Sequence, residues 1–245
     1  MNRATALLAP MLAMALGAAQ AEDRRSGFDF MSPATQALQR DDMLNPAWLW
    51  LKDGEQRFEA GCGRCHEPTS MRGVATRYPA FDSALARPVT LAERINLCRT
   101  RQAGQPALPL EDDALLGLEV YVANLSRGLP IAPPADARLT TWRERGRLLY
   151  FQRVGQLDFS CAMCHDQHAG GRLAGSTIPQ GHPTGYPIYR LEWQGVGGLQ
   201  RRLRNCMSGV RAEPYAYGAP EYVALELYLQ QRAAGLPLET PAVRP

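Results

Sequence analysis

Apolar residues recur at helical spacing in two segments of the chain, residues 112–128 and 220–235. In each segment they follow one another at intervals of three and four, which places them on one face of a helix. The positions are Leu115, Leu118, Val122 and Leu125 in the first segment, and Val223 and Leu227, flanked by Tyr222 and Leu229, in the second. Gly128 and Gly235 end the segments, where a helix cap with positive φ is expected. The pattern predicts two amphipathic closing helices.

These helices belong to a longer internal repeat. A lone cysteine precedes each one, and an arginine lies four residues before each cysteine: Arg94 before Cys98, and Arg202 before Cys206. The glycine that ends each helix follows its cysteine by 30 residues in the first copy and by 29 in the second. Matching positions over such a length predict a tandem duplication.

The first copy ends in a proline-containing segment, GLPIAPPADA, at residues 128–137. Prolines cannot continue a helix, so this segment is expected to be a linker. Thr140 or Thr141 is then predicted to cap the next helix, which runs through Arg143 to Phe151.

The chain begins with the pattern of an export signal. The first residues, MNRATALLAPMLAMALGAAQA, have a basic start at Arg3, an apolar stretch over 4–19 and a small-residue exit, AQA, at 19–21. We expect residues 1–21 to be a cleaved signal peptide, with the mature protein exported to the periplasm. A retained anchor fits less well because Pro10 interrupts a stretch that is short for a membrane. No later segment is predicted to span a membrane.

Charge excludes one class of partner and suggests another. The formal net charge is only +3, which gives no reason to expect nucleic-acid binding. Lys52 is the one lysine among 27 basic residues, so nearly all positive charge is arginine. Planar guanidinium groups are suited to binding oxyanions.

Four of the six cysteines belong to two copies of the same motif. CGRCH begins at Cys62 and CAMCH at Cys161, and both match Cys-x-x-Cys-His, the attachment motif of c-type haem. The expected covalent attachment residues are Cys62, Cys65, Cys161 and Cys164, and the expected iron ligands are His66 and His165. A zinc site would need two further ligands near each motif, and a redox disulfide would not require the histidine. The sequence therefore predicts two haem c groups.

Motifs and repeat together predict the fold. Each half reads as a helix, a haem motif, a long loop, a helix with the lone cysteine and a closing helix. We expect an all-α protein of two tandem cytochrome c-type domains, with the first haem in residues 22–135 and the second haem and active site in 136–245.

Cys98 and Cys206 are candidates for the second iron ligand of each haem. Methionine or histidine is the common occupant, and the other candidates are Met71, Met163, Met207, His168 and His182. No methionine occupies matching places in both halves, whereas the two cysteines do. A Cys98–Cys206 disulfide remains the structural alternative.

The surroundings of Cys206 predict that the second half carries the chemistry. Its basic neighbours are Arg201, Arg202, Arg204 and Arg211, against Arg94, Arg99 and Arg101 around Cys98. Arg202 and Cys206 would share one helical face at i and i+4. A guanidinium there would lower the thiol pKa and bind an anion against the sulfur. Arg201 and Arg204 are equally consistent with a solvated face.

Both haem motifs, the cysteine after each, and GYPIYRLEWQGVGGLQRRLRNCM at residues 185–207 resemble the SoxA family, the dihaem subunits of bacterial SoxAX cytochromes of thiosulfate oxidation. The resemblance implies that Cys206 is the catalytic residue, often a persulfide in the family, with Arg202 as its basic partner. It also implies iron ligation by His66 and Cys98 and by His165 and Cys206. The implied reaction is L-cysteine S-thiosulfotransferase: oxidative joining of thiosulfate to a cysteine of a SoxYZ-like carrier, with electrons passing to a SoxX-like monohaem cytochrome.

Two other functions stay open at this point. A plain dihaem electron carrier would have methionine on the irons and no thiosulfate chemistry. A thiosulfate dehydrogenase would form tetrathionate without any carrier protein.

Overall fold

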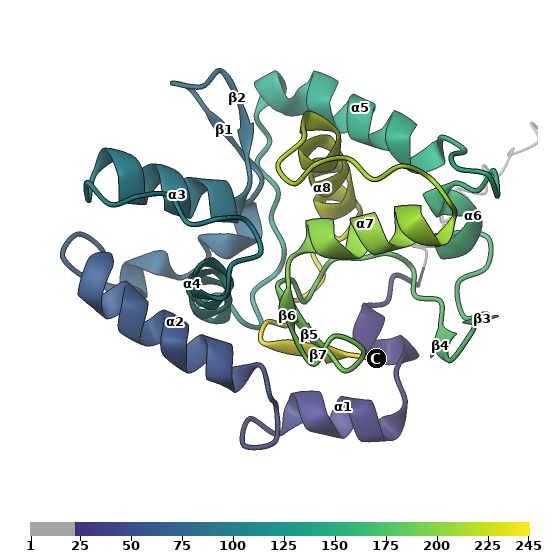
Figure 1. Cartoon of the computed structure of the whole chain (residues 1–245), viewed down its shortest axis with the longest axis horizontal. Helices are drawn as coiled ribbons and strands as arrows, with labels where there is room; N and C mark the ends of the chain where they lie inside the picture. The colour runs from purple at the N-terminus through teal and green to yellow at the C-terminus, as the bar shows by residue number, and fades with distance from the viewer. Residues whose placement is uncertain (1–22) are drawn as a thin grey trace, which may run out of the picture.

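The computed structural model describes residues 23–245, and the predicted signal peptide lies outside them. Two groups of helices lie side by side, with α2, α3 and α4 on the left of Figure 1 and α5 to α8 on the right. The α-helices are α1 (Pro33–Arg40), α2 (Trp48–Gly61), α3 (Leu91–Arg101), α4 (Asp113–Asn124), α5 (Thr140–Phe151), α6 (Cys161–His165), α7 (Leu199–Gly209) and α8 (Pro220–Arg232). The predicted succession of helices in each half is therefore present.

The expectation of an all-α fold is confirmed only in part, because short strands lie in the loops after both motifs and, in one case, near the C-terminus. They are β1 (Ala80–Asp82), β2 (Arg87–Val89), β3 (Arg172–Leu173), β4 (Ser176–Thr177), β5 (Ile188–Arg190), β6 (Gly195–Gly197) and β7 (Ala242–Arg244). β1 pairs with β2 and β3 with β4, and the third sheet has the order β6-β5-β7. Each loop thus gains backbone hydrogen bonds that a plain coil would lack.

The repeat is visible in the order of elements. The hairpin β1-β2 and helix α3 of the first half correspond to β5-β6 and α7 of the second, and β5, β6 and α7 each begin 108 residues after their counterparts. Antiparallel pairing joins Asp82 to Arg87 in one hairpin and Arg190 to Gly195 in the other. Asp82 and Arg190 therefore occupy the same position in the two copies.

Symmetry breaks at the ends of the chain. β7 adds to β5 in parallel, with Tyr189 opposite Val243, and the first hairpin has no such third strand. The Nδ2 amide of Asn45 donates to the Pro241 carbonyl over 2.9 Å, and the Val243 N–H donates to the Gln39 side chain. The N-terminal helix α1 is thereby attached to the C-terminal strand, so contacts cross the boundary predicted at residues 135/136, which stays a prediction.

Helix α5 begins differently from the prediction. Thr140 is already its first residue, and neither threonine caps it, because a short 3-10 helix (Ala137–Leu139) precedes it and Leu139 is the cap residue. Asp136 caps that 3-10 helix instead, accepting from the Arg138 N–H over 2.9 Å. Asp and Thr are both favoured cap residues, so the sequence does not show whether a helical turn begins after Asp136 or after Thr140.

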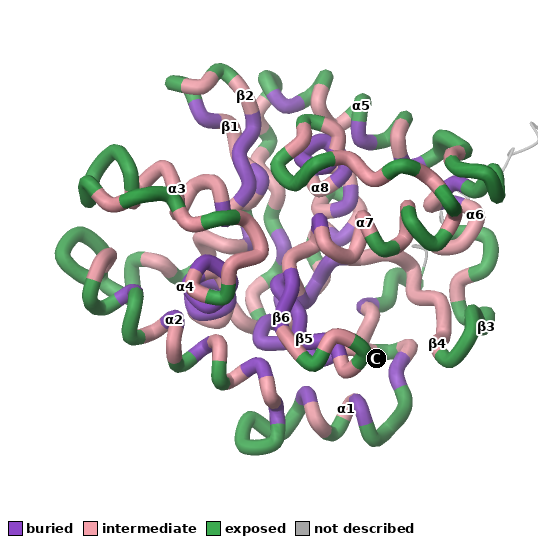
Figure 2. Tube along the Cα trace, viewed as in Figure 1, coloured by how far each residue is buried: buried purple, intermediate pink, exposed green. Residues whose placement is uncertain are grey.

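Each half contains one close helix crossing, between α2 and α4 in the first half and between α5 and α8 in the second. The apolar faces predicted for α4 and α8 are buried there, as the buried segments in Figure 2 show for α4. Glycines allow the backbones to touch: a Cβ on Gly54 of α2 would lie 1.9 Å from the Gly117 carbonyl oxygen of α4. A Cβ on Gly146 of α5 would lie 2.0 Å from the Ala224 carbonyl oxygen of α8. The two crossings are therefore equivalent and equally close.

The Gly54→Ala variant is expected to lose stability by about 2–4 kcal/mol, because the methyl group forces α2 away from α4. Thermal unfolding of the haem-bearing protein measures the loss. Gly61→Ala, in the same helix, is the matched control, since its Cβ would meet only the Gln105 side chain at 3.9 Å. Equal unfolding temperatures for the two variants would contradict the close crossing.

The segments after α4 and α8 pair with each other at the junction of the halves. The N–H of Gly128 donates to the Leu238 carbonyl, and the N–H of Gly235 donates to the Ile131 carbonyl, each over 2.8 Å. Both glycines have the predicted positive φ, 81° and 86°, although the helices end a few residues earlier, at Asn124 and Arg232. The glycines shape this paired junction.

A cavity of about 90 Å³ lies at the junction and is lined by both halves. Glu119 of α4 and Glu226 of α8 face it, and each lies nine residues before the glycine of its own repeat. Burial raises the pKa of Glu226 to about 7, although Gln200 donates a hydrogen bond to it over 2.7 Å. Burial, and then the neighbouring Glu226, raise the pKa of Glu119 well above its ordinary value.

Glu226 is expected to make stability fall with rising pH. A folded-state pKa above the ordinary 4.5 means that the folded protein holds this proton more tightly, so its stabilising effect is complete below about 4.5 and is lost by about 7. Glu226→Gln should remove this slope and be more stable than wild type at pH 8 by about 1–3 kcal/mol. Denaturant unfolding from pH 4 to 8 measures it, with exposed Glu213→Gln as control. An unchanged slope in Glu226→Gln would contradict the assignment.

Candidate functional site

The second haem motif forms its own helix, α6. Ser160 caps it, with the hydroxyl oxygen accepting from the Met163 N–H over 3.3 Å. Cys161 and Cys164 are three residues apart in this helix, so both thiols lie on one side of it. His165 is the last residue of the helix. The cap therefore fixes the direction from which two thiols and an imidazole project.

His165 faces the cysteine of the neighbouring helix. Its Nδ1 donates to the Pro179 carbonyl over 2.7 Å, because a carbonyl can only accept. This contact leaves Nε2 as the free ring nitrogen, as in a metal-binding histidine oriented by a backbone carbonyl. The Cys206 side chain, which projects from α7, lies near the His165 ring, and hydrogen bonding with that ring lowers the pKa of the Cys206 thiol. The structure thus brings together the two residues predicted to bind the second iron.

The thiols of this site differ in their acidity. Burial raises the pKa of Cys206, but the hydrogen bond with His165 and the charges of Arg202, His165 and Arg190 outweigh it, so the net pKa is lowered. Burial, followed by the neighbouring Cys206, raises the pKa of Cys161 to about 11. The pKa of Cys164 is raised by the same two causes. The arrangement favours a thiolate at Cys206.

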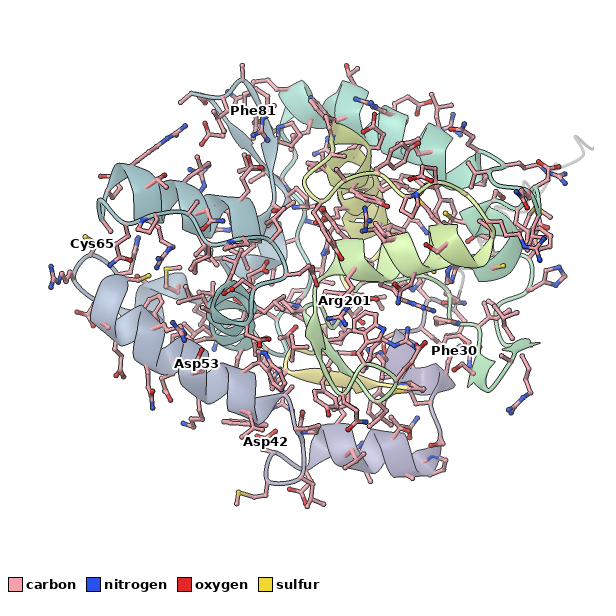
Figure 3. The ribbon with its side chains drawn as sticks, viewed as in Figure 1. Phe30, Asp42, Asp53, Cys65, Phe81 and Arg201 are labelled. Carbon is pink, nitrogen blue, oxygen red and sulfur yellow. The ribbon has the colours of Figure 1, made fainter. Side chains whose placement is uncertain are left out.

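The first haem motif has a more open setting. Cys62 caps the C-terminus of α2, and Cys65 and His66 follow in an exposed turn, with Cys65 at the left edge of the molecule in Figure 3. Burial raises the pKa of Cys62, Cys98 of α3 raises it further, and the charge of Arg99 opposes them. The motif and the lone cysteine of the first half are therefore also neighbours.

The residues at both motifs fit a covalently bound haem. All six cysteines lie among the described residues and all six are free thiols, including Cys98 and Cys206. Each motif thus offers the two thiols and the histidine that attachment of a c-type haem requires, and the lone cysteine of the same half is a further potential donor. Within residues 23–245, no group of three or more His, Cys, Asp or Glu side chains is arranged to hold a bare metal ion.

The other candidate ligands have separate roles. Met207 packs in the core of the second half and its sulfur accepts from the Tyr222 hydroxyl over 3.3 Å. Met71 packs against the core of the first half, and Met163 lies inside α6. His182 Nδ1 contacts the Arg25 carbonyl over 2.7 Å, and His168 is exposed in the turn after α6. Met71 and Met207 thus pack against the same cores as Cys62 and Cys161, and the choice of the lone cysteines as iron ligands stays a prediction.

The arginines of α7 divide into two kinds. Arg201, near the centre of Figure 3, lies over the Trp193 ring at 4.4 Å. Arg204 hydrogen-bonds the Tyr215 carbonyl and lies 4.7 Å from the Tyr217 ring. Arg202 instead is an arginine whose positive charge lowers the pKa of the Cys206 thiol. Both flanking arginines thus have packing roles, whereas Arg202 acts on the Cys206 thiol; its role in catalysis stays a prediction.

Sequence reasoning missed a polar cluster behind α6. The Tyr150 hydroxyl donates to Asp166 over 2.8 Å, and Arg232 Nη2 contacts the same carboxylate oxygen over 2.6 Å. Asp166 follows His165 directly, so α5 and α8 both hold the end of the motif helix. Nothing in the spacing of these three residues signals their contact, because they come from three different elements.

The described helices include none that is both long and apolar enough to cross a membrane.

Comparisons with known proteins agree on one family. A model of the SoxA/TsdA cytochrome c domain matches residues 48–131 and 145–238. The L-cysteine S-thiosulfotransferase subunit SoxA of Rhodovulum sulfidophilum is 33% identical over 91% of this chain and 81% of its own length. The protein of the same name from Paracoccus pantotrophus is 31% identical over 89% of this chain and 78% of its own length.

A solved structure shares the fold. The crystal structure of SoxXA from P. pantotrophus superposes with a TM-score of 0.87 at 31% identity, covering 91% of this chain and 87% of that one. The family match in two segments also agrees with the internal repeat, so the protein consists of two tandem cytochrome c domains. The chain belongs to the SoxA family of c-type cytochromes.

Proposed function

We propose that this protein is an L-cysteine S-thiosulfotransferase subunit, which joins thiosulfate oxidatively to a cysteine of a carrier protein. The observation that carries the proposal is the Cys206 thiol, which is held by His165 and Arg202 with its pKa below the ordinary value. The relatives that match most of the chain bear this activity in their names. A thiolate beside a fixed positive charge suits chemistry on a sulfur anion.

Two haem c groups belong to this proposal. Cys62 and Cys65 would attach the first and Cys161 and Cys164 the second, with iron ligation by His66 and Cys98 and by His165 and Cys206. The convergence of His165 and Cys206 supports the second set, and the proximity of Cys62 and Cys98 supports the first. Each haem, when bound, supplies an acceptor for one electron.

The reaction balances with two such acceptors. A carrier thiol and a thiosulfate dianion form one sulfur–sulfur bond, giving a thiosulfonate-capped cysteine with one negative charge and releasing one proton and two electrons. Cys206, as a thiol or carrying an extra sulfur atom, would hold the sulfur being transferred. Arg202 would neutralise the negative charge brought beside the thiolate.

The proposed partners follow from the same reaction. A carrier of the SoxYZ type would present the acceptor cysteine, and a SoxX-like monohaem cytochrome would take the electrons onward. The solved relative is a crystal structure of SoxXA, which supports the second partner. The apolar start of the chain, whose structure lies outside the described residues, supports export to the periplasm.

The test is a reconstituted reaction. The haem-bearing protein is mixed with thiosulfate, a purified SoxYZ-type carrier and an oxidised c-type cytochrome, and the carrier is weighed by mass spectrometry. We expect the carrier to gain one thiosulfonate group for every two electrons accepted. Tetrathionate formed without the carrier would identify a thiosulfate dehydrogenase instead, and no thiosulfate-dependent electron transfer would identify a plain electron carrier.

A further inference from the structure

The two repeats carry opposite charges at one equivalent position. Asp82 is the last residue of β1, and Arg190 is the last residue of β5, its counterpart. Both side chains are buried, with 5% and 7% of their surface exposed. In each half the next helix carries the arginine that precedes the lone cysteine, Arg94 in α3 and Arg202 in α7. The strand residue therefore decides the charge around that arginine.

In the first half the strand residue neutralises the arginine. Asp82 Oδ2 lies 2.8 Å from Arg94 Nη2 and 3.9 Å from Arg101 Nη1. The backbone N–H of Leu85 and the charge of Arg94 hold the pKa of the Asp82 carboxyl below its ordinary value, although burial opposes them. The positive charge of Arg94 is thus neutralised by an internal ion pair, so Arg94 attracts an anionic ligand only weakly.

In the second half the strand residue adds a positive charge. Arg190 Nη2 contacts only one carboxylate, that of Glu192, at 2.8 Å, and the Glu192 side chain is 61% exposed. The Arg190 Nε is buried without a hydrogen-bond partner. An unpaired buried donor costs free energy unless something accepts from it. The Arg190 guanidinium therefore has an unused donor that Asp82 could not offer.

Arg190 and Arg202 act on each other and on Cys206. Arg202 is the largest charged influence on the Arg190 guanidinium after burial, and both arginines act on the Cys206 thiol. Among the ion pairs of residues 23–245, none involves Arg202. Arg190 occupies the place from which Asp82 reaches Arg94 in the first half, and Arg202 lies one helical turn before Cys206 in α7. Two guanidinium groups thus replace an ion pair beside the thiol, and the carboxylate that contacts Arg190 among the described residues is mostly solvated. Such an arrangement favours a ligand with two negative charges.

We propose that Arg190 and Arg202 together form a binding site for a tetrahedral oxyanion with two negative charges beside Cys206, and that Asp82 closes the equivalent site in the first half. The inference rests on the proposed function, in which thiosulfate is that dianion. Its sulfonate oxygens would accept from the two guanidinium groups, and its outer sulfur would lie toward Cys206. Arg190 thus selects the substrate by charge.

Calorimetry on the haem-bearing protein tests the site with thiosulfate and with sulfate, an unreactive dianion. We expect one thiosulfate per chain in wild type, and a dissociation constant raised about 10- to 100-fold in Arg190→Gln, since hydrogen bonds to charged groups have this effect. Arg190→Lys should recover part of the loss. Arg201→Gln is the matched control: Arg201 lies over the same Trp193 ring as Arg190, at 4.4 Å against 5.1 Å, but is not among the main groups that act on the Cys206 thiol, so this variant should bind as wild type does. Unchanged binding in Arg190→Gln would overturn the proposal.

A second variant leaves Arg190 in place. Glu192→Gln removes the one carboxylate that contacts Arg190, so thiosulfate and sulfate should both bind several-fold more tightly than in wild type. Equal or weaker binding would contradict an uncompensated arginine pair. The visible haem spectrum and the unfolding temperature confirm that each variant is folded.

The arginine site and the proposed conjugation reaction can be disproved separately. If Arg190→Gln binds sulfate and thiosulfate normally while conjugation still depends on Cys206, the arginine site is wrong and the proposed function stands. If wild type conjugates nothing but binds sulfate through Arg190, the proposed function is wrong and the anion site stands.

Discussion

Cys206→Ala is expected to abolish thiosulfate conjugation, with turnover reduced by at least about 10³-fold, as when a catalytic nucleophile is removed. The reason is local: Cys206 is the cysteine that His165 and Arg202 hold with a lowered pKa. The measurement is the rate at which the carrier gains a thiosulfonate group in the reconstituted reaction. Turnover within tenfold of wild type would contradict the assignment of Cys206.

Cys98→Ala is the matched control for this prediction. Cys98 has the same place in the first repeat, but the arginine that precedes it is paired with Asp82. We therefore expect Cys98→Ala to change the spectrum of one haem while conjugation continues at a rate within about tenfold of wild type. Peptide mass spectrometry of wild type shows in addition whether Cys206, and not Cys98, carries an extra sulfur atom. Equal loss of turnover in both variants would mean that iron ligation alone, and not the chemistry of Cys206, explains the effect.

The amphipathic helices and the haem-attachment motifs were predictable from the sequence because each pattern is complete within a short stretch of residues. The apolar spacing of residues 115–125 follows from the helix repeat itself, and those residues are buried in α4. A Cys-x-x-Cys-His motif is likewise complete in five residues. The proximity of His165 and Cys206 was predicted from the family resemblance and from the repeat, because no local pattern links the two residues.

Short strands and buried charges were not predictable in the same way. β1 and β5 have three residues each, too few for an alternating pattern to rise above coil. Arg190 lies within the segment that resembles the family, but its buried charge gains significance only beside the equivalent residue of the other copy, Asp82. An alignment of the two repeats through their hairpins, 108 residues apart, is the signal that would have revealed it.

Replacing Cys161 and Cys164 together by serine is expected to remove one haem from the protein. Without thiols α6 has no covalent attachment for the porphyrin, whereas the first motif, in a separate group of helices, keeps its own. Intact mass should fall by one haem, and haem absorbance per chain should fall by about half, because each motif holds one group. Conjugation should be lost in the same variant, since the proposed chemistry lies in that half.

The variant with serine at Cys62 and Cys65 shows whether the loss of conjugation depends on how many haems remain or on which haem is lost. It should also lose one haem, yet Cys206, His165 and Arg202 stay as in wild type, because they belong to α6 and α7. With an oxidised external cytochrome present to take the second electron, a first turnover on the carrier should persist, while the steady-state rate falls further because every turnover now depends on that cytochrome. If either double variant kept the wild-type mass, the attachment sites would be wrong. If the variant at Cys161 and Cys164 conjugated and the variant at Cys62 and Cys65 did not, the active site would belong to the first half, where Asp82 neutralises the arginine.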